Sequence, residues 1–149
     1  QLTKVRNRRF FMSRLANELK LAEHRYHVSV AAFRVDLDKL YRAGGTRGGD
    51  IVLQAVAAAL LSQVRAGDNF ARIDADTFGM ILPKADEARA KEIAARIAEL
   101  AAKRPYHTHT EKPVRIRISQ AIVFARADEA ADMLWRRLID TFREYDEPF

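Results

Sequence analysis

The chain has 149 residues, the size of one domain, and its 26 lysines and arginines against 20 acidic residues give a net charge of +6. The absence of cysteine excludes a disulfide framework and a thiolate metal site or nucleophile. The longest purely apolar run, residues 55–61, is far shorter than the roughly 20 residues that a membrane helix needs. Arginines are spread along the whole chain, so we expect a solvated basic surface, with no nucleic-acid stripe and no membrane contact from this segment.

The first half of the chain predicts two helices around a buried strand. Apolar side chains at helical spacing indicate an amphipathic helix over residues 7–25, with Asn7 as its cap. A nearly continuous apolar run over residues 28–36 is typical of a central strand covered on both faces. Residues 50–64 are apolar on most sides, which predicts a largely buried helix that ends before Gly67.

A hairpin and a third helix follow. Two alternating apolar runs, residues 70–73 and 78–82, flank a polar stretch and predict two paired strands. Asp86 is a suitable N-cap for a helix that continues to about Lys103. The side chains expected to face inward on this helix are Ala90, Ile93, Ile97 and Leu100.

The last third predicts a polar loop over residues 104–112, a strand over 114–124 and a helix over 130–143. Trp135 and Phe142 lie seven residues apart on that helix, a spacing that favours core packing over a base-stacking platform. The resulting order is α-β-α-β-β-α-β-α. This order, together with a family resemblance carried by the motifs below, implies an α+β fold with helices on an antiparallel or mixed sheet.

The hairpin carries the most specific pattern of the chain. Residues 70–83 read FARIDADTFGMILP and resemble the A-R-L-G-G-D-E-F-A-V-L-L-P stretch of GGDEF domains. These domains are the diguanylate cyclases, which join two GTP molecules into cyclic di-GMP. The positions that match the five signature residues are Asp74, Ala75, Asp76, Thr77 and Phe78.

Four further segments resemble the same family in the same order. Residues 2–11, LTKVRNRRFF, are similar to its L-T-G-L-x-N-R-R-x-F opening, and residues 28–38 to its first core strand, which ends in Asp-x-Asp. Gly49-Asp50 matches the family's Gly-Asp, and residues 115–125 resemble its late strand. The resemblance covers nearly the whole chain. It implies a nucleotidyl cyclase palm, which is a mostly antiparallel sheet flanked by helices.

The resemblance also implies the origin of the chain. We take residues 1–149 as a single degenerate GGDEF domain excised from a longer protein, because the chain begins without methionine on the family's opening motif. The family implies the bacterial cytoplasm, with tethering to a membrane through missing regions left open.

Several departures from the family pattern predict that catalysis is lost. The resemblance implies that paired glycines let the GTP phosphates approach closely, whereas Asp74 and Ala75 add Cβ atoms and a carboxylate there. Thr77 replaces the signature glutamate. The family's metal ligands match Asp36 and Asp76, so Mg²⁺ could still bind, but carboxylates at strand ends and turns are also common without a metal. We expect no catalytic residue and no required cofactor.

Two more departures agree with this expectation. The segment between Asp38 and Gly49 is three residues shorter than in the family, and the asparagine that would bind guanine has no counterpart. Near the end, residues 140–147 carry acidic groups where the family has phosphate-binding cations.

A second site of the family is matched more closely. Arg65-x-x-Asp68 lies at the spacing at which GGDEF domains carry the R-x-x-D of their inhibitory site, where cyclic di-GMP binds. The resemblance places a further arginine of that site at Arg96, and Arg89 shares its helix stripe as an auxiliary contact. An arginine can donate to guanine O6 and N7, and a carboxylate can accept from N1 and N2.

An alternative account of these residues is purely structural. Arg65 could cap the C-terminus of its helix, and Asp68 could be a turn carboxylate. Arg96 could pair with Glu92 or Glu99 on its own helix.

The chain has four histidines that suggest a metal site: His24, His27, His107 and His109. His107-x-His109 lies in a polar loop with no nearby third ligand, so we expect ordinary exposed loop histidines.

The sequence therefore predicts a catalytically inactive GGDEF domain that serves as a cyclic di-GMP receptor. Ligand binding would control docking onto flanking domains or a partner protein, or formation of a homodimer. Two alternatives stay open. One is a residual Mg²⁺-dependent diguanylate cyclase, and the other is a scaffold that dimerises or docks without nucleotide.

Overall fold

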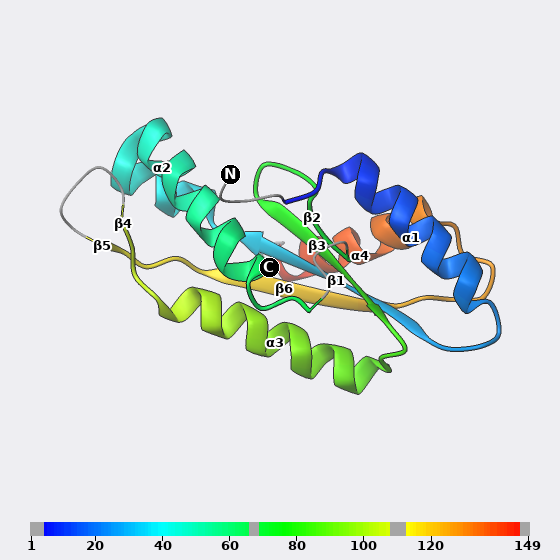
Figure 1. Ribbon diagram of the computed structural model, residues 1–149. Helices are drawn as coiled ribbons and strands as arrows, with labels where there is room; N and C mark the ends of the chain where they lie inside the picture. The colour runs from blue at the N-terminus through cyan, green and yellow to red at the C-terminus, as the bar shows by residue number, and fades with distance from the viewer. Residues whose placement is uncertain (1–4, 66–68, 108–112, 147–149) are drawn as a thin grey trace.

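The computed structural model describes the backbone of residues 5–65, 69–107 and 113–146, and the side chains of these ranges except 37–47 and 143–146. Four helices and six strands make up this part of the chain (Figure 1). In chain order they are α1 (Arg8–Ala22), β1 (Val28–Val35), α2 (Leu37–Leu61), β2 (Phe70–Arg72), β3 (Thr77–Pro83), α3 (Glu87–Lys103), β4 (Tyr106–His107), β5 (Pro113–Val114), β6 (Ile118–Phe124) and α4 (Ala131–Asp146).

The main sheet has the strand order β2-β3-β1-β6, and every pairing is antiparallel. Strand β1 is central, and its Ser29 lies opposite Leu82 on one side and Phe124 on the other. The short edge strand β2 gains an isolated parallel bridge between Arg6 and Ala71. Helices flank this sheet, so the predicted α+β fold is confirmed.

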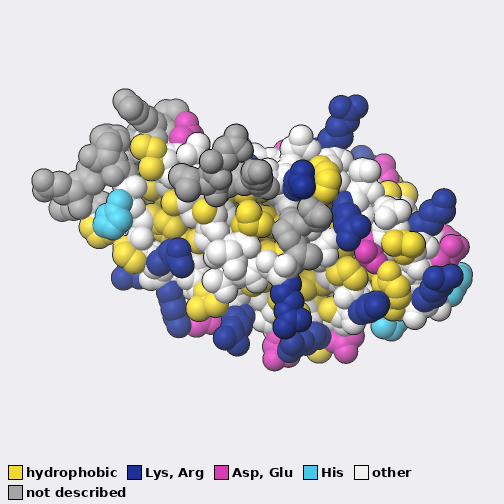
Figure 2. All heavy atoms as spheres, in the orientation of Figure 1, with side chains coloured by type: hydrophobic (Ala, Val, Ile, Leu, Met, Phe, Trp, Pro, Cys, Tyr) yellow, Lys and Arg dark blue, Asp and Glu magenta, His cyan; other side chains and the backbone are white. Residues whose placement is uncertain are grey.

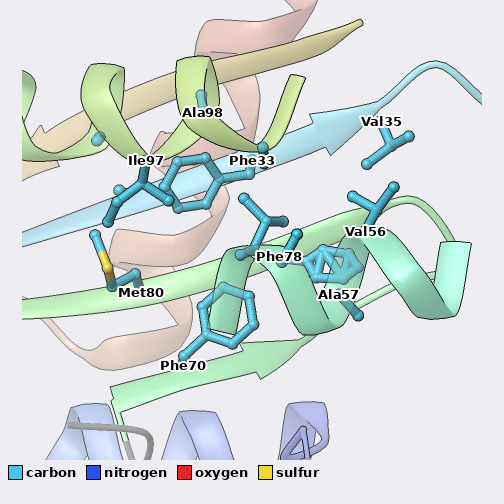
Figure 3. Close-up of a cluster of buried hydrophobic side chains, with 14 of the residues drawn as sticks. Phe33, Val35, Val56, Ala57, Phe70, Phe78, Met80, Ile97 and Ala98 are labelled. Atoms are coloured by element: carbon cyan, nitrogen blue, oxygen red, sulfur yellow. The ribbon is translucent and has the colours of Figure 1, made fainter. Parts of the chain in front are cut away.

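One face of the sheet is covered by α2 and α3. Phe33, Phe70 and Phe78 are completely buried there, and the rings of Phe70 and Phe78 stack with centroids 5.7 Å apart (Figure 3). Helix α3 packs closely against β6 and β1. It does so through a row of buried small side chains: Ala90, Ala94, Ala98 and Ala101.

The opposite face is covered by α1 and α4. Phe11 and Trp135 meet edge to face with ring centroids 5.3 Å apart, and both are buried. Gly79 of β3 lies directly beneath them, where a Cβ atom would come within 2.8 Å of the Phe11 ring. Phe142 is 2% exposed, so the predicted core positions of Trp135 and Phe142 are confirmed.

Both predicted helix caps are confirmed. The side chain of Asn7 accepts a hydrogen bond from Phe10 N at 2.9 Å, and that of Asp86 accepts one from Arg89 N at 2.8 Å. Such caps satisfy backbone donors that the first helical turn leaves without partners.

Three predictions about elements were wrong. Helix α2 begins at Leu37, thirteen residues before the predicted start. The glycines of its first half have low helix propensity, so the sequence pattern did not indicate a helix there. Leu100 was expected to face inward but is 39% exposed, since the alanine row of α3 is its inner face. The predicted loop 104–112 includes β4, which pairs with β5, and the last strand of the main sheet begins only at Ile118.

Candidate functional site

The hairpin between β2 and β3 closes in a tight turn. Ile73 N donates to Thr77 O at 2.8 Å, and Thr77 N donates to Asp74 O at 3.4 Å. The guanidinium of Arg72 donates to Ala75 O at 2.7 Å. Neither Asp74 nor Ala75 is among the described non-glycine residues with positive φ, so the turn does not need the left-handed conformations that glycine favours.

The turn carries a solvated negative charge. The side chain of Asp74 is 62% exposed, and its carboxylate lies 3.9 Å from the guanidinium of Arg8, which is 53% exposed. An ion pair between two exposed groups contributes little to stability. The Asp74 carboxylate is therefore a surface charge at the tip of the hairpin.

Asp36 and Asp76 lie at neighbouring strand ends. Val35 N donates to Asp76 O at 2.9 Å, which holds the end of β1 beside the start of β3. One carboxylate oxygen of Asp76 accepts from the Thr77 hydroxyl at 2.9 Å. Magnesium often binds through one or two carboxylates completed by phosphate and water, so Asp36 and Asp76 are the residues that would hold such an ion. No cluster of three or more acidic or histidine side chains suited to a metal occurs among the described residues.

Helix α4 ends near this region. The guanidinium of Arg34, on β1, lies 4.5 Å from the ring centroid of Phe142. Of the acidic residues in the segment 140–147, Asp140 is exposed on α4, and the side chains of the others lie outside the described residues.

The arginines predicted to bind cyclic di-GMP lie at α2 and α3, which cover the same face of the sheet (Figure 1). Arg65 is exposed and follows the turn that ends α2, whereas Asp68 lies outside the described residues. Arg89 and Arg96 are exposed and, seven residues apart, share one stripe of α3. Figure 2 shows Lys and Arg side chains gathered along α3.

These three guanidinium groups make no hydrogen bond or ion pair with a described residue. The carboxylates of α3 pair with lysines, because Glu87 lies 3.0 Å from Lys91 and Glu99 lies 2.9 Å from Lys103. The hydrogen bond from Lys103 lowers the pKa of Glu99. The alternative pairing of Arg96 with Glu99 is therefore not formed.

The histidines do not form a metal site within the described part of the chain. The ring of His27 packs on Phe124 with centroids 4.8 Å apart, and His107 is exposed on β4. His109 lies outside the described residues. His24 and His27 instead line a groove of about 1110 Å³ at the end of the sheet where β1 begins and β6 ends.

Sequence reasoning missed a buried polar cluster that involves Glu18 of α1 and Asn69. Glu18 is 5% exposed, and Asn69 is 8% exposed. A pattern in the sequence could have indicated it, because Phe11, Leu15, Glu18 and Ala22 form the buried stripe of α1. A carboxylate within an apolar stripe requires specific partners.

No helix among the described residues has the length and apolar character to cross a membrane.

The chain is 32% identical over 109 residues, 71% of its length, to the probable diguanylate cyclase DgcE of Escherichia coli (strain K12), and that match spans 10% of DgcE.

Two solved structures share the fold. The GGDEF domain of TpbB from Pseudomonas aeruginosa superposes with a TM-score of 0.85 at 28% identity, over 97% of this chain and 86% of that one. The GGDEF domain of DgcB from Caulobacter crescentus, in complex with c-di-GMP, gives 0.85 at 20% identity, over 97% and 84%. The model of the diguanylate cyclase GGDEF domain family matches residues 1–141, and the chain therefore belongs to the GGDEF family.

Proposed function

We propose that this domain is a catalytically inactive GGDEF domain that binds cyclic di-GMP and transmits its presence by docking or dimerising. The ligand would contact Arg65 and Arg96, with Arg89 as an auxiliary contact and Asp68 reading the guanine edge. A ligand that binds the docked arrangement better than the free one shifts the equilibrium towards docking. Flanking domains, a partner protein or a second copy of the chain would receive the signal.

The observation that carries this proposal is that the three arginines are exposed and have no described partner. Arg65, Arg89 and Arg96 are exposed and unpaired with any described residue, while the neighbouring Glu87 and Glu99 are occupied by lysines. Unpaired guanidinium groups are available to bind phosphate and purine edges. The DgcB domain with the same fold was solved with c-di-GMP, which supports this ligand for the present chain.

The turn of the hairpin supports the loss of catalysis. In the motif resemblance Asp74 and Ala75 match the family's paired glycines, and the Asp74 carboxylate is exposed at the tip of the hairpin. A triphosphate brought to this turn would meet a like charge and two added Cβ atoms. Electrostatic repulsion at this point disfavours the close approach that phosphoryl transfer requires.

Isothermal titration calorimetry with cyclic di-GMP tests the receptor role. Arg65→Ala, Asp68→Ala and Arg96→Ala are each expected to weaken binding at least about tenfold, because each removes a charge-assisted hydrogen bond. Arg136→Ala is the matched control, because Arg136 is an exposed arginine on α4, which covers the other face of the sheet. Absence of binding by the folded parent would contradict the receptor role, and equal self-association with and without ligand would favour a scaffold.

A residual cyclase is the second candidate, favoured by the backbone hydrogen bond from Val35 N to Asp76 O, which places Asp36 and Asp76 at neighbouring strand ends. Incubation with GTP and Mg²⁺, followed by chromatography of the nucleotides, separates the two. We expect no cyclic di-GMP from the parent. Product that disappears in Asp76→Asn would establish the cyclase and overturn the proposed inactivity.

A further inference from the structure

A groove of about 1110 Å³ lies at the end of the sheet where α1 ends, β1 begins and β6 ends, on the right in Figure 1. Its volume is comparable to that of the largest small-molecule sites, which reach about 1,000 Å³. Arg65, Arg89 and Arg96 do not line the groove, and neither do Asp36 and Asp76. The groove is therefore separate from the described residues of both candidate sites.

Three residues that can donate hydrogen bonds to an anion lie in a row at this end of the sheet. Lys84, His27 and Arg126 flank the ends of three adjacent strands, β3, β1 and β6. Lys84 N donates to His27 O at 2.7 Å, and Ala125 N donates to Val28 O at 2.9 Å, so the strand pairing continues to this row. Neighbouring strands are about 4.8 Å apart, so the backbones of the three residues lie within roughly 10 Å of one another. All three side chains are exposed and line the groove.

The charges around the groove favour an anion. Four lysine or arginine side chains line it, and so do the carboxylates of Glu23, Asp128 and Glu129. The Glu129 carboxylate is already held by Arg137 at 2.8 and 2.9 Å, so two carboxylates remain against four cations. Figure 2 shows Lys, Arg and His side chains together at this end of the molecule.

Aromatic rings adjoin this row of donors. The Nζ atom of Lys84 lies 5.3 Å from the ring centroid of Tyr26, and the His27 ring packs on Phe124 with centroids 4.8 Å apart. Tyr26 and Phe124 are partly buried and line the groove, so each offers part of a ring surface to it. Polar donors beside apolar surface are typical of sites for organic molecules, so an anion joined to a flat apolar body fits better than a bare ion.

The backbone is strained at three points around the groove. The described non-glycine residues with positive φ are His24, Lys84 and Asp128, at 59°, 65° and 61°, and all three line the groove. Histidine and lysine adopt such values at a steric cost that glycine avoids. Strained residues of this kind cluster at ligand-binding and active sites, so their position supports a binding role for the groove.

We infer that the groove binds a small organic phosphate, a phosphate monoester joined to a flat apolar body. The phosphate would lie between Lys84 and Arg126, whose two positive charges match its dianion, and His27 would donate a further hydrogen bond. The apolar body would pack on the rings of Tyr26 and Phe124. The domain would then have a second ligand in addition to cyclic di-GMP, held by different residues.

Titration of the 149-residue domain with phenyl phosphate, followed by amide NMR spectra, tests the inference. We expect saturable shifts at His27, Lys84 and residues 125–128. Inorganic phosphate and benzyl alcohol should bind more weakly, because the first lacks the apolar body and the second lacks the charge. No saturable shift at these residues in the folded parent, or equal affinity for phenyl phosphate and inorganic phosphate, would overturn the inference.

Two glycine substitutions separate the charge from the backbone. Glycine adopts positive φ without steric cost, so Lys84→Gly and Asp128→Gly should both fold at least about as stably as the parent. Lys84→Gly removes a cation and should weaken phenyl phosphate binding about threefold, whereas Asp128→Gly removes a like charge and should tighten it about twofold.

Arg126→Ala should also weaken binding about threefold. Arg9→Ala is its matched control, because Arg9 is an exposed arginine at the opposite end of α1 from the groove. Equal affinities of Lys84→Gly and Asp128→Gly, or an equal loss in Arg126→Ala and Arg9→Ala, would overturn the assignment of the phosphate to this row.

Discussion

Replacing Gly79 by alanine is expected to destabilise the domain. The added Cβ would lie 2.8 Å from Cζ of Phe11 and 3.0 Å from two ring atoms of Trp135, whereas carbon atoms in favourable contact are about 3.5–4.0 Å apart. Both rings are buried, so neither can move into solvent. Overpacking of this kind costs about 1–3 kcal/mol, and the better strand preference of alanine offsets about 0.5–1 kcal/mol.

The middle of these ranges leaves a net loss of about 1 kcal/mol in the free energy of unfolding, which lowers the Tm of a domain of this size by roughly 2–4 °C. Urea denaturation and thermal melting of the parent and Gly79→Ala measure it. Phe11→Leu removes the nearest ring atom, so Gly79→Ala should cost less in that background. A Gly79→Ala protein as stable as the parent, or an equal cost in both backgrounds, would refute the steric reasoning.

Three further perturbations test contacts elsewhere in the fold. The hydrogen bond from Arg137 lowers the pKa of Glu129. The stability that this bond contributes to the fold is therefore fully present above the ordinary glutamate pKa of about 4.3, and it is lost as the pH falls through the lowered pKa. Stability measured by urea denaturation should therefore fall less steeply with acidification in Glu129→Gln, and an identical pH profile would exclude this linkage. Tyr106→Phe removes a buried hydrogen bond of 2.6 Å to Ala101 O and should cost about 1 kcal/mol in the free energy of unfolding, so an unchanged urea midpoint would argue against that bond. Asp86→Ala should cost about 1 kcal/mol in the same assay with Asp86→Asn close to the parent, and equal losses in both variants would show that capping is not the cause.

Elements with local chemical cues were predictable from the sequence. Asn7 and Asp86 cap helices through hydrogen bonds to residues three positions away, so the information lies within one turn. The alternating hairpin strands are likewise a local pattern. The exposed arginines of α3 followed from its helical periodicity.

Features that depend on distant contacts were not predictable. The start of α2 at Leu37 runs against the low helix propensity of its glycines, and only the assembled fold shows it. The bond between Arg14 and Asn69 joins positions 55 residues apart, and no periodicity indicates such a pair. The two-residue strands β4 and β5 are too short to produce a recognisable pattern.

The row of buried alanines on the inner face of α3 limits how the sequence of this helix can change during evolution. Small side chains set the distance between α3 and the sheet, so a larger residue at Ala90, Ala94 or Ala98 would shift the helix as a unit. Such a shift would displace Arg89 and Arg96 together. Substitutions on the outer face leave that spacing intact, so the outer face of α3 can diverge while its inner face remains constrained.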